Sequence, residues 1–427
     1  MTLKEYEKIN ERVYTDTLPN GLTVKVVPKP GFHKKYAYFV TDYGGVDRRF
    51  KLKNDWIDTP AGVAHFLEHK MFDTQDGNAL EKLSANGASP NAYTSSDITA
   101  YHFECIDMFN ENLEILLDFV SKPYFTHESV EKEQGIITQE IRMIEDDPDF
   151  CLYYGLLKSL FKNNPIRDSV AGTVESIGTI TADILYDCHK IFYSPSNMVL
   201  CITGDIDPSL ICETAAKILP AGSGNVPLRD YGMIESLLPE TADIRKNMEV
   251  SLPVFLAGCK VEPVANGRDA LWLEIVAALA LELLCGHSSS LYMRLYSEGL
   301  VNADFSASFD SAAGVAYTMF GGETRDPDRV YAEVKDEIVK ISENGPDADL
   351  FERIRKASIG SHIRALNSFG VIASSIAEGH FRGFDTFEAP DLLAKISVDD
   401  IKDFIHNNLV PGNMAISVIN PKNEVMI

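Results

Sequence analysis

Runs of apolar residues divide the first half of the chain into short strands and longer helices. Four runs rich in β-branched and aromatic residues are typical of strands: Leu22–Val27, Tyr36–Thr41, Thr99–Cys105 and Met198–Gly204. Between them, apolar residues recur every three to four positions, which predicts helices at Pro60–Met71, Asn78–Ala85, Asn110–Ser121, Glu128–Glu145 and Ala182–Ile191. This mixture of elements predicts an α/β domain.

A second block of elements follows a segment that resembles a linker. Residues 220–239 collect glycine, proline, serine and charged residues, which favour irregular structure. Strands are then predicted at Val254–Val261, Val315–Phe320 and Met414–Ile419, and helices at Ala270–Leu284, Ser289–Ser297, Pro327–Ser342 and Leu350–Leu366. The two halves share a rough order of elements without an obvious sequence repeat. We predict a first domain over residues 1–222, a linker over 223–244 and a second domain over 245–427.

Length and charge are consistent with this division and limit the partners. A chain of 427 residues exceeds the size at which a single core usually keeps growing. Its formal charge of −24 argues against a nucleic acid as the main partner, because binding phosphate requires a basic surface.

The sequence also bears on the compartment. The apolar stretch Ala270–Leu284 is interrupted by Glu274 and Glu282, so we expect a buried helix and no membrane span. The first residues lack the apolar core of a secretory signal. Seven scattered cysteines without a C-x-x-C pair fit a reducing compartment and give no support to a thiolate zinc site. We expect a cytoplasmic protein.

The most informative segment is H-x-x-E-H, formed by His65, Glu68 and His69. Thr59 is a suitable N-cap and Pro60 a suitable first residue for a helix that carries this motif. Histidines four residues apart on a helix project from the same face, so both imidazoles can reach one zinc ion. Glu68 lies beside them and can act as a base toward water at that ion. The same pattern also fits an amphipathic helix whose histidines are merely packed or exposed.

A catalytic zinc site with two histidines usually takes a third ligand from a carboxylate. The predicted helix Glu128–Glu145 offers Glu131, Glu133, Glu140 and Glu145. Glu133 and Glu140 are seven residues apart and return to nearly the same helix face, so one can ligate while the other supports the site. Spacing alone does not choose among the four glutamates.

The motif and its surroundings resemble the pitrilysin/insulinase family of inverted-zincin metallopeptidases. The resemblance rests on AGVAHFLEHKMF and, about seventy residues later, EQGIITQEIRMIEDDP. It extends to LPNGLTVKVVP, SPNAYTSSDITAYHF and NMVLCITGDID. The chain is most similar to the half-length branch that includes the mitochondrial processing peptidases and their bacterial relatives. The resemblance implies an α/β (α+β) fold of two similar domains, each a mostly antiparallel sheet packed with helices, that together form half of a clamshell.

The resemblance also implies roles for individual residues. The third zinc ligand is Glu140, with Glu133 as the supporting carboxylate, and each chain binds one Zn²⁺. Glu68 is the general base on the zinc-bound water. An extended peptide substrate adds as a strand to a sheet edge, and Ser89–Thr94, with Asn91 and Ala92, matches that edge. Asn91 equally fits a simple turn residue after Pro90.

One departure from the family concerns the second domain, which often contributes an Arg and a Tyr that reach the substrate. Arg294 matches the arginine, but no tyrosine stands at the expected position near residues 301–302. We therefore favour a surface cation over a catalytic role for Arg294. Because the metal half is intact while this half is eroded, we favour a dimer with a homologous, zinc-free chain over a homodimer.

These observations predict a zinc-dependent endopeptidase that cleaves peptides or precursor segments inside a closed chamber. Two other classes of function stay open. One is a non-catalytic subunit of a larger assembly, which would typically lose ligands or the base. The other is a zinc-dependent protein that binds peptides without cutting them.

Overall fold

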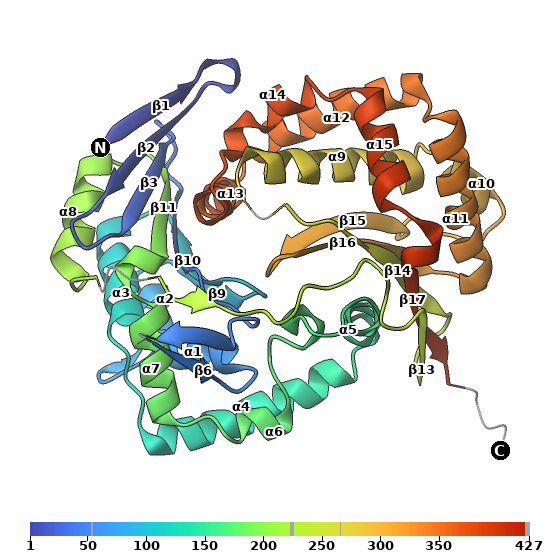
Figure 1. Ribbon diagram of the computed structural model, residues 1–427. Helices are drawn as coiled ribbons and strands as arrows, with labels where there is room; N and C mark the ends of the chain where they lie inside the picture. The colour runs from blue at the N-terminus through green and yellow to red at the C-terminus, as the bar shows by residue number, and fades with distance from the viewer. Residues whose placement is uncertain (53, 223–225, 265, 423–427) are drawn as a thin grey trace. The chain divides into compact units, whose positions relative to one another are not determined.

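A computed structural model describes residues 1–427 except residues 53, 223–225, 265 and 423–427, and the chain forms two compact units (Figure 1). The first unit contains Met1–Ile141, Ser169–Asp230 and Ile363–Phe387. The second contains Arg142–Asp168, Tyr231–His362 and Glu388–Ile427.

The first unit is built on a 7-stranded sheet with the order β1-β2-β3-β11-β4-β10-β9. Its strands are β1 (Thr2–Tyr6), β2 (Glu11–Thr17), β3 (Thr23–Pro28), β4 (Lys35–Thr41), β9 (Ser89–Thr94), β10 (Thr99–Cys105) and β11 (Met198–Gly204). Only β3 and β11 pair in parallel among these described strands. A smaller sheet joins β5 (Arg49–Leu52), β6 (Asp55–Asp58) and β12 (Leu228–Arg229), and β7 (Asp73–Thr74) pairs with β8 (Gly77–Asn78).

The first unit also contains helices. They are α1 (Val63–Met71), α2 (Ala79–Ala85), α3 (Phe109–Ser121), α4 (His127–Glu145), α6 (Val174–Ile177), α7 (Ala182–Phe192), α8 (Pro208–Ile218) and α13 (Phe369–Arg382). The buried face of α13 carries Ile372, Ala373 and Ile376, which pack with Val40 of β4 and Val199 of β11. Burial of these apolar side chains fixes α13 against the middle of the sheet.

The second unit is built on a 5-stranded sheet with the order β13-β17-β14-β16-β15. Its strands are β13 (Asp243–Met248), β14 (Val254–Val261), β15 (Ser306–Ala312), β16 (Val315–Glu323) and β17 (Met414–Pro421). Its helices are α5 (Pro148–Leu160), α9 (Arg268–Cys285), α10 (Ser290–Ser297), α11 (Pro327–Asn344), α12 (Ala348–Ala365), α14 (Ala389–Leu393) and α15 (Val398–Asn408).

Five of the seven strands in the first sheet repeat the topology of the second sheet. The order β3-β11-β4-β10-β9 in the first unit matches β13-β17-β14-β16-β15 in the second, with the same chain order and the same single parallel pair. The helix on each sheet also corresponds, since α13 packs against β11 and β4 while α5 packs against β17 and β14. This confirms the predicted fold class, two similar units that each combine a mostly antiparallel sheet with helices.

Each of these two helices comes from the opposite half of the sequence. Helix α5 precedes β11 in the chain yet packs on the sheet of the second unit, and α13 precedes β17 yet packs on the sheet of the first. The predicted division at residues 222 and 245 therefore follows the order of the two sheets along the chain. Each compact unit additionally takes in one helix from beyond that division.

Most predicted elements lie within a few residues of their expected bounds, and α5 is an element that the pattern missed. Pro148 lies at the junction of two helices. It follows α4, which stops at Glu145, and it begins α5 as its first residue. The side chain of Asp147 caps the new helix by accepting the backbone N–H groups of Asp149 and Phe150.

The apolar segment expected to be a buried helix is α9. The stretch Arg268–Ser297 is the one helical stretch of the described residues that is long and apolar enough to cross a membrane. Within its most apolar window 61% is buried inside the structure, and α9 packs against β15 and α15. These contacts are those of a core helix.

Candidate metal centre

Helix α1 begins at Val63 rather than at Pro60, so the expected start of this helix is wrong. Thr59 does not cap it, because the Thr59 hydroxyl donates to the Arg48 carbonyl at 3.2 Å. The Thr59 backbone N–H donates to the same carbonyl at 2.8 Å and prolongs the β5–β6 hairpin. Gly62 precedes the helix instead, with a φ of 94° that favours glycine. A Cβ at Gly62 would lie 2.7 Å from the Ala171 carbonyl oxygen, so the close approach of this backbone segment also requires glycine there.

The remaining residues of α1 separate an apolar face from a polar one. Val63, Phe66, Leu67 and Met71 are buried, and they fix the helix against the body of the first unit. His65, Glu68 and His69 are only partly buried and project from the other face. The helix therefore presents the two imidazoles and the carboxylate together.

The two histidines converge with Glu140 of α4. His65 Nε2 lies 3.5 Å from Glu140 Oε1, and His69 Nε2 lies 3.5 Å from Glu140 Oε2. One ligand atom from each residue lies within 4.8 Å of the others. Donor atoms around a tetrahedral zinc with bonds of about 2.0–2.2 Å are separated by about 3.3–3.5 Å. The three side chains therefore fit a zinc ion.

Glu133, two turns before Glu140 on α4, holds the second histidine. Its Oε1 lies 3.1 Å from His69 Nδ1, and the side chain is 14% exposed. A carboxylate that accepts Nδ1–H fixes the tautomer with Nε2 free for a metal. The buried Nδ1 of His65, in contrast, has no hydrogen-bond partner among the described residues.

The electrostatics of this group reflect its acidic surroundings. Burial disfavours protonation of His69, but the hydrogen bond that its Nδ1–H donates to Glu133 and the charges of Glu140 and Glu68 outweigh it and raise the pKa of His69. The hydrogen bond to His65 lowers the pKa of Glu140, and the nearby His69 lowers it further. Both directions reflect the attraction between the protonated imidazoles and the ionised carboxylates.

Glu68 is held by the edge strand of the sheet. Thr94, the last residue of β9, donates its hydroxyl to Glu68 Oε2 at 2.7 Å. The same hydroxyl oxygen lies 3.3 Å from that of Thr99 on β10. Glu68 therefore has a fixed orientation, and one carboxylate oxygen is without a protein hydrogen bond among the described residues.

Strand β9 carries Asn91 and Ala92 at the edge of the sheet. Its one partner among the described strands is β10, with Asn91 opposite His102 and Ala92 opposite Tyr101. Asn91 is thus a strand residue, and the alternative of a turn after Pro90 is wrong. The Ala92 N–H donates to the Asn91 side chain at 2.9 Å, so this donor is not used in the ladder with β10.

Arg294 lies in the second unit, on α10, and is engaged by an acidic neighbour. Its Nη1 is 2.7 Å from Glu333 Oε2, and its side chain is 42% exposed. This contact agrees with the surface-cation alternative for Arg294.

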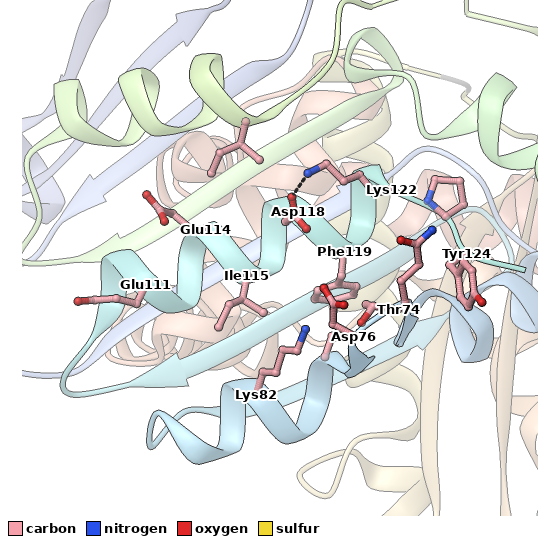
Figure 2. Close-up of a pocket in the computed structure, with 14 residues that line it drawn as sticks. Thr74, Asp76, Lys82, Glu111, Glu114, Ile115, Asp118, Phe119, Lys122 and Tyr124 are labelled. Carbon is pink, nitrogen blue, oxygen red and sulfur yellow. Dashed lines mark hydrogen bonds and ion pairs between the residues drawn. The ribbon is translucent and has the colours of Figure 1, made fainter.

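A cavity of about 730 Å³ in the first unit is separate from the metal centre (Figure 2). It lies between α2, α3 and the β7–β8 turn, and none of the predicted site residues lines it. Its walls include the carboxylates of Asp76, Glu111, Glu114 and Asp118, the last of which pairs with Lys122.

Two residues near the site were not predicted. Thr94 is a common strand residue, and nothing in its spacing indicates a contact with Glu68. Lys70 directly follows His69, is buried, and lies 4.0 Å from Glu133 Oε2. The sequence does contain one signal for Lys70. Phe66, four residues earlier, lies on the same face of the helix and predicts an apolar residue at position 70, so a charged residue there is unexpected.

Comparisons with known proteins agree with this geometry. Residues 57–174 match the model of the insulinase family, peptidase family M16, and residues 179–358 match the model described as the peptidase M16 inactive domain. An uncharacterized zinc protease of Bacillus subtilis, YmfH, is 38% identical over 98% of this chain and 99% of its own. The probable mitochondrial-processing peptidase subunit beta of Arabidopsis thaliana is 27% identical over 47% of this chain and 38% of its own.

A solved structure extends the similarity to the whole fold. The crystal structure of a putative M16-like peptidase from Alicyclobacillus acidocaldarius has a TM-score of 0.93 and 33% identity, and the match covers 96% of this chain and 99% of that one. With the matched family models, the full-length similarity and the His65, His69 and Glu140 group, the chain belongs to the pitrilysin/insulinase family of metallopeptidases, peptidase family M16, as a half-length member.

Proposed function

We propose that the chain is a zinc-dependent endopeptidase in which His65, His69 and Glu140 hold one Zn²⁺ and Glu68 is the general base. The observation that carries this proposal is the convergence of the three ligand side chains, with Glu68 one turn from His65 on the same helix. A zinc ion at this position would supply a Lewis acid and lower the pKa of a bound water to about 7.

The protein groups have distinct tasks in peptide hydrolysis. Glu68 accepts a proton from the attacking water and donates it to the leaving amine. Thr94 keeps one Glu68 oxygen in a hydrogen bond, so the other is directed to the reaction. Glu133 keeps His69 in the tautomer whose Nε2 faces Glu140.

The substrate that suits this site is an extended peptide. The open edge of β9 can pair with a peptide backbone, and the Ala92 N–H, held by the Asn91 side chain, is a donor available for exchange. Asn91 would then release this donor to the substrate. Since main-chain hydrogen bonds do not depend on side-chain identity, such a site accepts many peptides or precursor segments.

The proposal includes a second subunit and a closed chamber. Arg294 is paired with Glu333 and lacks the tyrosine that the family resemblance leads us to expect. A homologous, zinc-free chain that supplies both groups would complete the site. The relative named as a beta subunit of a processing peptidase is consistent with such an assembly. The free cysteines favour a cytoplasmic location.

A non-catalytic or peptide-binding subunit is the alternative. It is favoured by the match of residues 179–358 to a domain described as inactive. Two variants separate the alternatives. Glu68→Gln should keep zinc and lose peptide cleavage by about 10²- to 10⁴-fold, because the base is removed. Glu140→Gln should lose zinc as well, because an amide is a poorer ligand than a carboxylate.

The measurements are zinc content by elemental analysis and cleavage of a mixed peptide library followed by mass spectrometry. Glu145→Gln, on the same helix but exposed, is the matched control and should keep both zinc and activity. Cleavage by Glu68→Gln at the wild-type rate would reject the proposed base. A wild-type chain that binds zinc and peptide but never cleaves would favour the binding subunit.

A further inference from the structure

Lys70 is a buried cation on the apolar face of α1. Its side chain is 1% exposed, and the residues three and four positions before it, Leu67 and Phe66, are both buried. An apolar side chain would suit this position. Lysine is almost never so deeply buried unless it is paired, because removing an ammonium group from water is costly.

The partners of Lys70 connect it to the metal centre. Its Nζ lies 2.5 Å from Asp73 Oδ2 and 4.0 Å from Glu133 Oε2. The other oxygen of Glu133 lies 3.1 Å from His69 Nδ1. One carboxylate therefore stands between the buried ammonium and the imidazole, with one oxygen toward each.

The contact between Lys70 and Glu133 lies in an acidic environment. Glu68, Glu133 and Glu140 bring three partly buried carboxylates together. Of the lysines and arginines in the described part of the chain, only Lys70 lies within ion-pair distance of any of the three. The Glu133 side chain is only 14% exposed. Without Lys70, no cationic side chain would offset the cost of burying this carboxylate, and it would turn toward solvent.

We propose that Lys70 is a positioning residue of the metal centre. Its ammonium holds the Glu133 carboxylate where it accepts the Nδ1–H of His69, and this keeps His69 Nε2 directed at the metal position. The inference rests on the proposed zinc site. The ammonium also repels a bound dication, but Glu133 and His69 lie between the two, so support of the ligand outweighs the repulsion.

The test is the zinc affinity of the metal-free full-length chain, measured by competition with a chromophoric chelator. Lys70→Met fills the same apolar space without the charge, and we expect it to bind zinc about 10-fold more weakly, at the low end of the 10- to 100-fold effects of groups that support ligands. Asp73→Asn is the matched control. It removes the other partner of Lys70, leaves the Glu133 contact, and should change the affinity less than 3-fold.

Repeating the Lys70→Met substitution in a Glu133→Gln variant separates positioning of Glu133 from a general structural effect of Lys70. In Glu133→Gln the carboxylate charge is absent, so adding Lys70→Met should weaken zinc binding less than 2-fold further. Equal weakening in both backgrounds, or unchanged affinity of Lys70→Met, would overturn the proposal. If Lys70→Met does not fold by circular dichroism, Lys70→Gln gives the same comparison. A wild-type chain that binds no zinc would instead refute the metal site itself.

Discussion

His189, on α7, is a buried histidine that makes the stability of the first unit depend on pH. Its side chain is 7% exposed, its ring stacks on Tyr193, and its Nε2–H donates to the Val120 carbonyl at 2.9 Å. Burial disfavours the charged ring and lowers the pKa of His189 to about 4, although the Val120 carbonyl partly opposes this. The folded protein therefore binds fewer protons than the unfolded chain between about pH 6.5 and pH 4.

It follows that acid destabilises the fold through this residue. The contribution is fully present above about pH 6.5 and falls by up to about 3 kcal/mol as the pH drops toward 4. His189→Gln keeps a donor for Val120 but does not titrate. In urea unfolding at pH 7 and pH 4.5, we expect the wild type to lose more stability than His189→Gln. Parallel losses in the two proteins would contradict the assignment.

Individual residues of the site differ in how far the sequence predicts them. His65, Glu68 and His69 follow from helical spacing, because residues on one helix turn must share a face. Glu140 does not, since four glutamates of α4 fit the spacing equally well. Burial separates them, because Glu131 and Glu145 are exposed while Glu133 and Glu140 are partly buried. That burial depends on how α4 packs against the rest of the first unit, and local sequence patterns do not predict such packing.

We propose that strand β9 binds the peptide substrate. A proline substitution in this strand tests that role. Ala92→Pro removes the Ala92 N–H from the open edge without removing a bond of the β10 ladder, because that N–H donates to Asn91. We expect kcat/KM for peptides to fall about 3- to 10-fold through loss of one hydrogen bond, with zinc content unchanged.

Ala92→Ser is the matched control for this change, because it keeps the N–H on the same strand. Peptide cleavage should stay near the wild-type rate in this variant. If Ala92→Pro also cleaves peptides with unchanged kcat/KM and full zinc content, the substrate does not pair with β9 at this position.

Element boundaries were predicted well where local periodicity decides them and poorly where tertiary contacts do. Strands such as β10 and β11 match their expected bounds, because a buried strand needs an unbroken apolar run. The start of α1 was misplaced, because Thr59 and Pro60 satisfy local capping rules, while the helix begins after Gly62, where the Ala171 backbone approaches closely. Capping rules contain no information about that approach.

At the scale of the molecule, both units repeat one sheet topology, and this repeat could not be predicted from the residue pattern alone. The five strands of the second sheet match five of the seven strands of the first, yet the halves share no obvious sequence repeat, since a topology constrains apolar pattern more than residue identity. The exchange of α5 and α13 between the sequence halves was also not predicted. It depends on long-range packing against β14 and β4, which lie far away in the chain.

The proposed partner is a prediction about the whole molecule. If a zinc-free homologous chain completes the site, the purified chain alone should cleave peptides slowly, and co-expression with such a chain should raise the rate and give a dimer by light scattering. Full activity of the chain by itself would favour a homodimer or a self-sufficient monomer. The control is Glu68→Gln paired with the same partner, which should remain inactive.

Anomalous diffraction at the zinc absorption edge, from crystals grown with zinc, would locate the metal directly. We expect one strong peak per chain, at bonding distance from His65 Nε2, His69 Nε2 and a Glu140 carboxylate oxygen. The same experiment on Glu140→Gln should show a weaker peak or none. Zinc-replete crystals without density at this position, or with the Glu140 side chain turned away from a bound ion, would contradict the proposed zinc site.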